Sequence, residues 1–87
     1  MSDKEAFERK VEGQLEEWQA ELDKAKAKAK QSSGEAEIKS KEKARDLEHR
    51  IEEGRRKLDT LKKAGADGWQ SVEKEIKSSW KDLKTKL

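Results

Sequence analysis

The chain has 87 residues, of which 48% are charged and 5% aromatic, and its formal net charge is +2. This length predicts one small domain, 1–87, with a core only just large enough to fold. The absence of cysteine excludes a disulfide framework and thiol chemistry. The N-terminus is charged and no apolar stretch reaches membrane-spanning length, so we expect a cytoplasmic protein.

Charge is distributed unevenly along the chain. Residues 1–23 contain three basic and eight acidic residues (net −5), residues 24–45 contain eight and three (net +5), and residues 46–87 contain eleven and nine (net +2). So high a charge content approaches that of disordered chains. The lack of proline and the helical spacing of the apolar residues argue instead for long helices.

The first predicted helix covers about residues 3–31, with Ser2 or Asp3 as its N-cap. Its apolar residues recur every three or four positions, which indicates one buried face. They are Phe7, Val11, Leu15, Trp18, Leu22, Ala25 and Ala29. The sequence 31-QSSG-34 then predicts a turn at 32–34, with Ser33 or Gly34 capping the next helix.

The second predicted helix covers about residues 35–64 and has its own apolar stripe. A short turn between two long helices implies an antiparallel hairpin, in which residue i lies beside residue 67 − i. The stripe consists of Ile38, Ala44, Leu47, Ile51, Leu58 and Leu61. Acidic residues near the start of the first helix then lie beside basic residues near the end of the second, which supports this register.

The last part of the chain repeats its apolar residues every eleven positions, from Trp69, Val72 and Ile76 to Trp80, Leu83 and Leu87. Gly65 and Gly68 interrupt the helical pattern, so we expect a turn at 65–67 and a third helix over about 68–86. Asp67 and Gln70 resemble a capping box at its start.

Folding the third helix back on the hairpin gives an all-α three-helix bundle with six core layers. Gly13, Gly54 and Ala44 leave room for large residues in these layers. The layers are Phe7/Leu61/Trp69, Val11/Leu58/Val72, Leu15/Gly54/Ile76, Trp18/Ile51/Trp80, Leu22/Leu47/Leu83 and Ala25/Ala44/Leu87. The alternative is a helix that continues through both glycines, giving an elongated coiled-coil hairpin that dimerises through its exposed apolar face.

Two stretches, 11-VEGQLEEWQAELDKAKAKA-29 and 58-LDTLKKAGADGWQSVEKEIKSSWKDL-83, carry a family resemblance. They resemble a functionally uncharacterised family of small bacterial coiled-coil proteins linked to stress responses. Gly13 and Gly68 stand where such proteins tend to have alanine. The resemblance implies a bacterial, stress-linked, non-enzymatic protein, and it brings no catalytic residues with it.

Nothing in the sequence predicts catalysis, a cofactor or a metal site. His49 is the only histidine, and without a second histidine or a cysteine it has too few partners to hold a metal ion. The adjacent pairs Glu16/Glu17 and Glu52/Glu53 point to different sides of a helix. We therefore expect no enzyme and no small-molecule substrate.

Two surfaces are candidates for contact with partners. The first is the amphipathic segment 67–87, whose Trp69 and Trp80 suit a helical core, a second copy of the chain or an anionic membrane surface. The second is an arm over residues 26–43 that projects beyond the third helix. Its lysines suit weak, non-specific binding to phosphates, but without arginine forks or aromatics no specific nucleic acid is expected. These lysines are Lys26, Lys28, Lys30, Lys39, Lys41 and Lys43.

The sequence thus predicts a protein that acts by contact with another protein or with itself. Peripheral association with an anionic membrane through segment 67–87 is the alternative, and weak nucleic-acid binding at the basic arm is a third.

Overall fold

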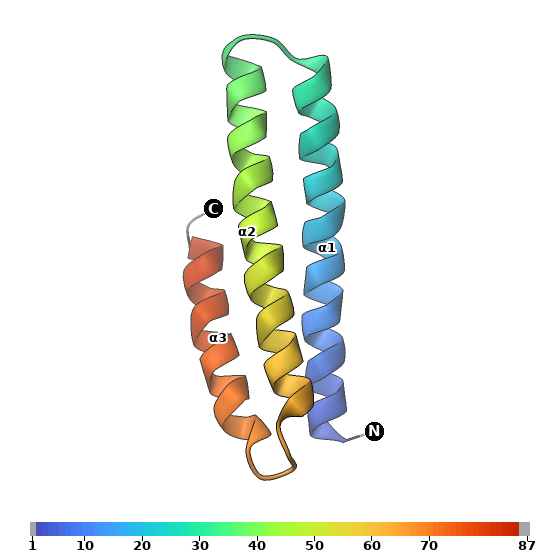
Figure 1. The fold of residues 1–87 in the computed structure, drawn as a ribbon, viewed down its shortest axis with the longest axis vertical. Helices are drawn as coiled ribbons and strands as arrows, with labels where there is room; N and C mark the ends of the chain where they lie inside the picture. The colour runs from blue at the N-terminus through green and yellow to red at the C-terminus, as the bar shows by residue number, and fades with distance from the viewer. Residues whose placement is uncertain (1, 86–87) are drawn as a thin grey trace.

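The computed structural model describes the backbone of residues 2–85 and the side chains of residues 2–80. It contains α1 (Asp3–Gln31), α2 (Glu35–Lys63) and α3 (Trp69–Thr85). Figure 1 shows α1 and α2 as an antiparallel hairpin, with α3 returning along α2. This arrangement confirms the all-α prediction and the third helix that folds back. The alternative of a helix running on through Gly65 and Gly68 is wrong, because the chain reverses there.

The boundaries of α1 and the start of α2 coincide with the predicted ones, and two further boundaries differ by a single residue. α2 ends at Lys63 instead of residue 64, and α3 begins at Trp69 instead of residue 68. The predicted end of the third helix at residue 86 lies outside the described residues.

The helix ends are capped partly as expected. The Ser2 hydroxyl accepts a hydrogen bond from the Glu5 amide at 3.2 Å, so Ser2 is the N-cap of α1. Gly34 is the N-cap of α2 and has a φ of 64°, which glycine adopts without steric cost. The expected capping box at Asp67 is wrong. The amides of Gly68 and Trp69 donate to the Gly65 carbonyl instead, and α3 starts two residues after Asp67.

Two adjoining clusters form the core. The first, nearer the arm, is built on Trp18, Leu22, Ala25, Ala44, Leu47 and Ile51. The second, nearer the turn into α3, is built on Val11, Leu61 and Ile76, with Phe7, Leu58, Trp69 and Val72 packed against it. Leu15 and Trp80 contact both clusters. The first four predicted layers therefore contain the correct partners, whereas Leu83 and Leu87 fall outside the described side chains.

Three small details of the packing follow from local geometry. A Cβ at Gly54 would lie 2.5 Å from Leu15 Cδ2, so this glycine does leave room for a core side chain. Gly13, expected to do the same, is exposed, and a Cβ there would have nothing within 4 Å, so that expectation is wrong. Ile38, expected in the buried stripe, is 57% exposed because it lies on the outer side of the arm.

The molecule is long and thin. Its principal extents are 51 × 22 × 16 Å and its radius of gyration is 15.3 Å, compared with about 12 Å for a spherical domain of this length. α3 is shorter than the hairpin, so the end of the hairpin near the 32–34 turn stands clear of it (Figure 1). The predicted arm therefore projects with two helices where the rest of the molecule has three.

Candidate functional site

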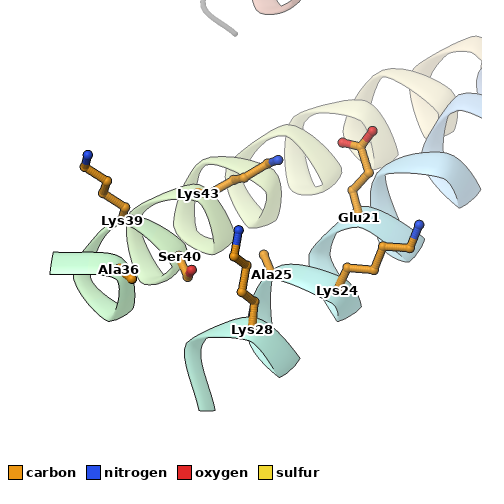
Figure 2. A pocket seen from close by; sticks show the side chains of 8 residues that line it. All are labelled: Glu21, Lys24, Ala25, Lys28, Ala36, Lys39, Ser40 and Lys43. Carbon is orange, nitrogen blue, oxygen red and sulfur yellow. The ribbon is translucent and has the colours of Figure 1, made fainter. Parts of the chain in front are cut away.

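The arm carries a groove between α1 and α2 that four lysines surround. Figure 2 shows Ala25 and Ser40 between the two helices, with lysine side chains on either side. The volume of the groove is about 380 Å³. We call it the lysine groove, and its lining residues are Glu21, Lys24, Ala25, Lys28, Ala36, Lys39, Ser40 and Lys43.

The lysine groove has a strongly positive rim and a floor of small side chains. Four lysines and one carboxylate, Glu21, line it, which gives a local charge of +3. Within the described part of the chain, none of the ion pairs involves these four lysines. Their ammonium groups thus remain available to an anionic partner.

Ser40 lies on the floor of the lysine groove and is only 7% exposed. Among the side-chain hydrogen bonds of residues 2–80, none involves its hydroxyl. The groove floor therefore offers one polar group in an otherwise apolar setting formed by Ala25 and Ala36.

A second groove, on the other side of the arm, has a different electrostatic character. It has a volume of about 520 Å³, and its lining residues are Lys26, Ala29, Lys30, Glu37, Lys41, Ala44, Arg45 and Glu48. Lys26 Nζ lies 3.5 Å from Glu48 Oε1, and Lys41 Nζ lies 3.2 Å from Glu37 Oε1. These ion pairs neutralise part of the positive charge on this side.

The structure thus divides the six predicted arm lysines between two surfaces. Lys28, Lys39 and Lys43 line the lysine groove. Lys26, Lys30 and Lys41 line the opposite groove, where two of them are paired with glutamates. The sequence predicted that all six lysines lie in one basic arm, and it did not distinguish the two sides of that arm.

Trp69 and Trp80 both pack inward. The rings of Trp80 and Trp18 are stacked, with centroids 4.9 Å apart and an interplanar angle of 16°. Trp69 is half-buried against the cluster of Val11, Leu61 and Ile76. One edge of Trp80 lines a shallow groove of about 360 Å³ between α1 and α3. The described apolar residues of α3 therefore pack on the hairpin.

His49 is exposed on α2. Among the described residues, no three histidine, aspartate or glutamate side chains come together in a way that would hold a metal ion. The arrangement of the described side chains is suited to binding through charge and shape.

Sequence reasoning missed two features of the site and one contact at the other end of the hairpin. Lys24 was left outside the arm, and Ser40 was not noticed, although Lys24/Lys28 and Lys39/Lys43 are each spaced by four residues and therefore share a helix face. The contact is made by Lys4, whose Nζ donates to the Ala64 and Lys62 carbonyls at 2.7 and 3.3 Å and so caps the end of α2. The predicted register places Lys4 beside residue 63, but it does not show that the ammonium group reaches the carbonyls there.

No protein-family model matches the chain, and comparison with curated proteins and with solved structures found no significant match. Within the described residues, no helix has both the length and the apolar character needed to cross a membrane.

Proposed function

We propose that the protein is a non-enzymatic helical bundle that acts by contact, with the lysine groove as its binding surface for an acidic partner protein. The observation that carries this proposal is the set of four lysines, without ion pairs in the described residues, around a floor of small side chains. Exposed lysines with no partner are suited to complementary charge on another molecule, which accelerates association and sets specificity.

Contact with a protein is favoured over the two other candidate functions. Membrane association through segment 67–87 requires α3 to leave the hairpin, which would expose the surfaces of Trp18 and Leu61 that it covers, both nearly fully buried. Each such side chain contributes about 1.5–3 kcal/mol by burial. Nucleic-acid binding would use the same lysines, but the groove floor of alanine and serine offers no aromatic surface on which bases stack.

The experiment compares two fourfold variants that remove the same charge from the two sides of the arm. The groove variant is Lys24→Gln/Lys28→Gln/Lys39→Gln/Lys43→Gln. The control variant is Lys26→Gln/Lys30→Gln/Lys41→Gln/Arg45→Gln. Wild type and both variants are immobilised and exposed to an extract of the cells in which the protein naturally occurs. Mass spectrometry then quantifies the proteins that each of the three captures.

We expect a small set of proteins to bind wild type and the control variant but not the groove variant. If both variants capture the same proteins as wild type, or lose them equally, the lysine groove is not a specific contact surface. Circular dichroism checks that each variant remains helical.

A bacterial, stress-linked role in the cytoplasm belongs to the same proposal and is supported by the sequence resemblance. It predicts that the protein becomes more abundant under stress and fractionates with cytosolic proteins. Quantitative immunoblotting of fractions from stressed and unstressed cells tests this, and unchanged abundance under every stress applied would contradict it.

A further inference from the structure

The lysine groove lies on the side of the hairpin that α3 covers further down. Beside α3, a groove is lined on α1 by residues 7, 10, 11 and 14. The lysine groove is lined on α1 by residues 21, 24, 25 and 28, which are the same positions moved on by fourteen. Fourteen residues make about four helical turns, so both sets face nearly the same way. The lysine groove therefore continues the surface of the hairpin on which α3 packs.

In the described part of the chain, no residue of α3 lines the lysine groove. α3 ends at Thr85, and Figure 1 shows the arm extending past it. Lower in the bundle the same side of α1 presents Phe7 and Val11, which pack with α3 residues. At the lysine groove the facing residues are Ala25, Ala36 and Ser40. Because these side chains are small, another helix can approach the hairpin closely there.

The charge on the rim selects the kind of helix that fits. Lys24 and Lys28 line one side and Lys39 and Lys43 the other, while Glu21 is the single carboxylate among the described lining residues (Figure 2). Lysine stems cover apolar surface while their ammonium groups remain in water. A helix lying between the two lysine pairs would meet positive charge on both flanks and apolar atoms beneath.

The occupant of the lysine groove depends on the proposed function, in which the groove binds an acidic partner protein. We propose that this occupant is a short acidic amphipathic helix of that partner. This helix lies along the hairpin beyond the described end of α3. A narrow stripe of its small or medium apolar residues contacts Ala25, Ala36 and Ser40. Its glutamates or aspartates face the four lysines. The stretch of α1 from Glu21 to its end is about 15 Å long, which matches a helix of about three turns.

The test uses two synthetic peptides of about fourteen residues with identical composition, rich in glutamate, alanine and leucine. In the stripe peptide the leucines recur every three or four residues and form one face. In the permuted peptide they are spread around the helix. Affinities for the full-length protein are measured by fluorescence anisotropy at two salt concentrations, alongside a double-stranded DNA oligonucleotide and vesicles containing anionic lipid.

We expect the stripe peptide to bind about tenfold more tightly than the permuted one, and more tightly than DNA or vesicles at the higher salt concentration. The substitution Ala36→Trp, at an exposed lining position, should block the groove without changing charge and weaken stripe-peptide binding by about tenfold. The groove lysine variant should weaken it as much, whereas the control variant should retain most of the affinity.

Equal binding of the two peptides, with no effect of Ala36→Trp, would overturn the helical occupant while leaving the lysine groove as an anionic contact surface. Tighter binding of DNA or vesicles than of the stripe peptide would overturn it in favour of those ligands. Failure of the proposed function itself would give a different result: wild type, the groove variant and the control variant would capture the same proteins from the cell extract.

Discussion

At the scale of single residues, the two glycines Gly13 and Gly54 sit at the same level of the hairpin but in opposite environments. Gly54 is buried, and a Cβ there would lie 2.5 Å from Leu15 Cδ2 and 3.6 Å from Trp18 Cζ3. Gly13 is exposed with nothing within 4 Å. The same substitution should therefore change stability in opposite directions at the two positions.

We expect Gly54→Ala to lower the free energy of unfolding by about 1 kcal/mol, because overpacking against Leu15 outweighs the gain in helix propensity. We expect Gly13→Ala to raise it by about 0.5–1 kcal/mol, because only the propensity gain remains. Urea denaturation followed by circular dichroism measures both. The double variant Leu15→Ala/Gly54→Ala tests the cause, since removing Leu15 should make Gly54→Ala neutral or stabilising. Stabilisation by Gly54→Ala alone would contradict the close approach.

Lys4 joins the first turn of α1 to the end of α2 by hydrogen bonds to two carbonyls, and within α1 it forms an ion pair with Glu8 at 3.9 Å. A helix C-terminus leaves carbonyls without partners, and a cation nearby also interacts favourably with the helix dipole. We expect Lys4→Met to lower the free energy of unfolding by about 1 kcal/mol at low salt.

The control for Lys4 is Lys10→Met, which removes an exposed lysine from the same helix. It should change stability by less than about 0.5 kcal/mol. Denaturation at low and high salt measures how much of the stability that Lys4 contributes is electrostatic, because salt screens that part. Equal effects of the two substitutions would show that Lys4 does not cap α2.

At the scale of elements, the attachment of α3 depends on burial more than on the turn that precedes it. Four described apolar residues of α3, Trp69, Val72, Ile76 and Trp80, pack on the hairpin. Full burial of such a side chain contributes about 1.5–3 kcal/mol; Ile76 is buried and the other three are half-buried. Their combined burial outweighs the preference for a continuous helix that two alanines would introduce, about 2 kcal/mol in total. Neither Gly65 nor Gly68 has a positive φ, so alanine fits the turn without strain.

We therefore expect Gly65→Ala/Gly68→Ala to remain folded back, with unchanged sedimentation. Trp80→Ala serves as the comparison, because it removes the stack with Trp18 and should loosen α3 while leaving the hairpin helical. Hydrogen exchange of α3 amides measures the loosening. A shift of the double alanine variant to an elongated dimer would show that the glycines, and not the core, hold the reversal.

At the scale of the whole molecule, the hairpin of α1 and α2 determines the length of the protein. α3 makes the protein thicker over part of that length. The acidic start of α1 lies at one end, partly balanced by α2 residues such as Lys62, which pairs with Glu12 at 3.3 Å. The basic segment 24–45 lies at the other end. The result is a rod with a three-helix base and a two-helix positive arm.

Small-angle X-ray scattering should give a radius of gyration near 15.3 Å, the value of the folded-back chain, increased slightly by hydration. A helix continuing from Glu35 to Thr85 would instead be about 75 Å long, well beyond the 51 Å extent of the described fold. Sedimentation at several concentrations separates a monomer from a dimer. A maximum dimension near the longer value would contradict the reversal at residues 64–68.

The sequence by itself determined the helices and the hairpin at residues 32–34, which follow from apolar spacing and from Gly34 and act locally. It left a continuous last helix open as an alternative, and the packing of Trp69, Ile76 and Trp80 on the hairpin decided the second reversal. The layer partners were also predictable, because a short turn fixes the register of an antiparallel pair.

Only the tertiary structure decided how the arm lysines are shared between two surfaces and which of them meet glutamates. Lys26 is paired across the hairpin with Glu48, and this depends on the rotation of each helix about its axis, which apolar spacing specifies only coarsely. The same rotation exposes Ile38 and buries Ser40. Among the described residues, α3 does not reach the lysine groove, so the free surface there arises from the packing of elements that are distant in the chain.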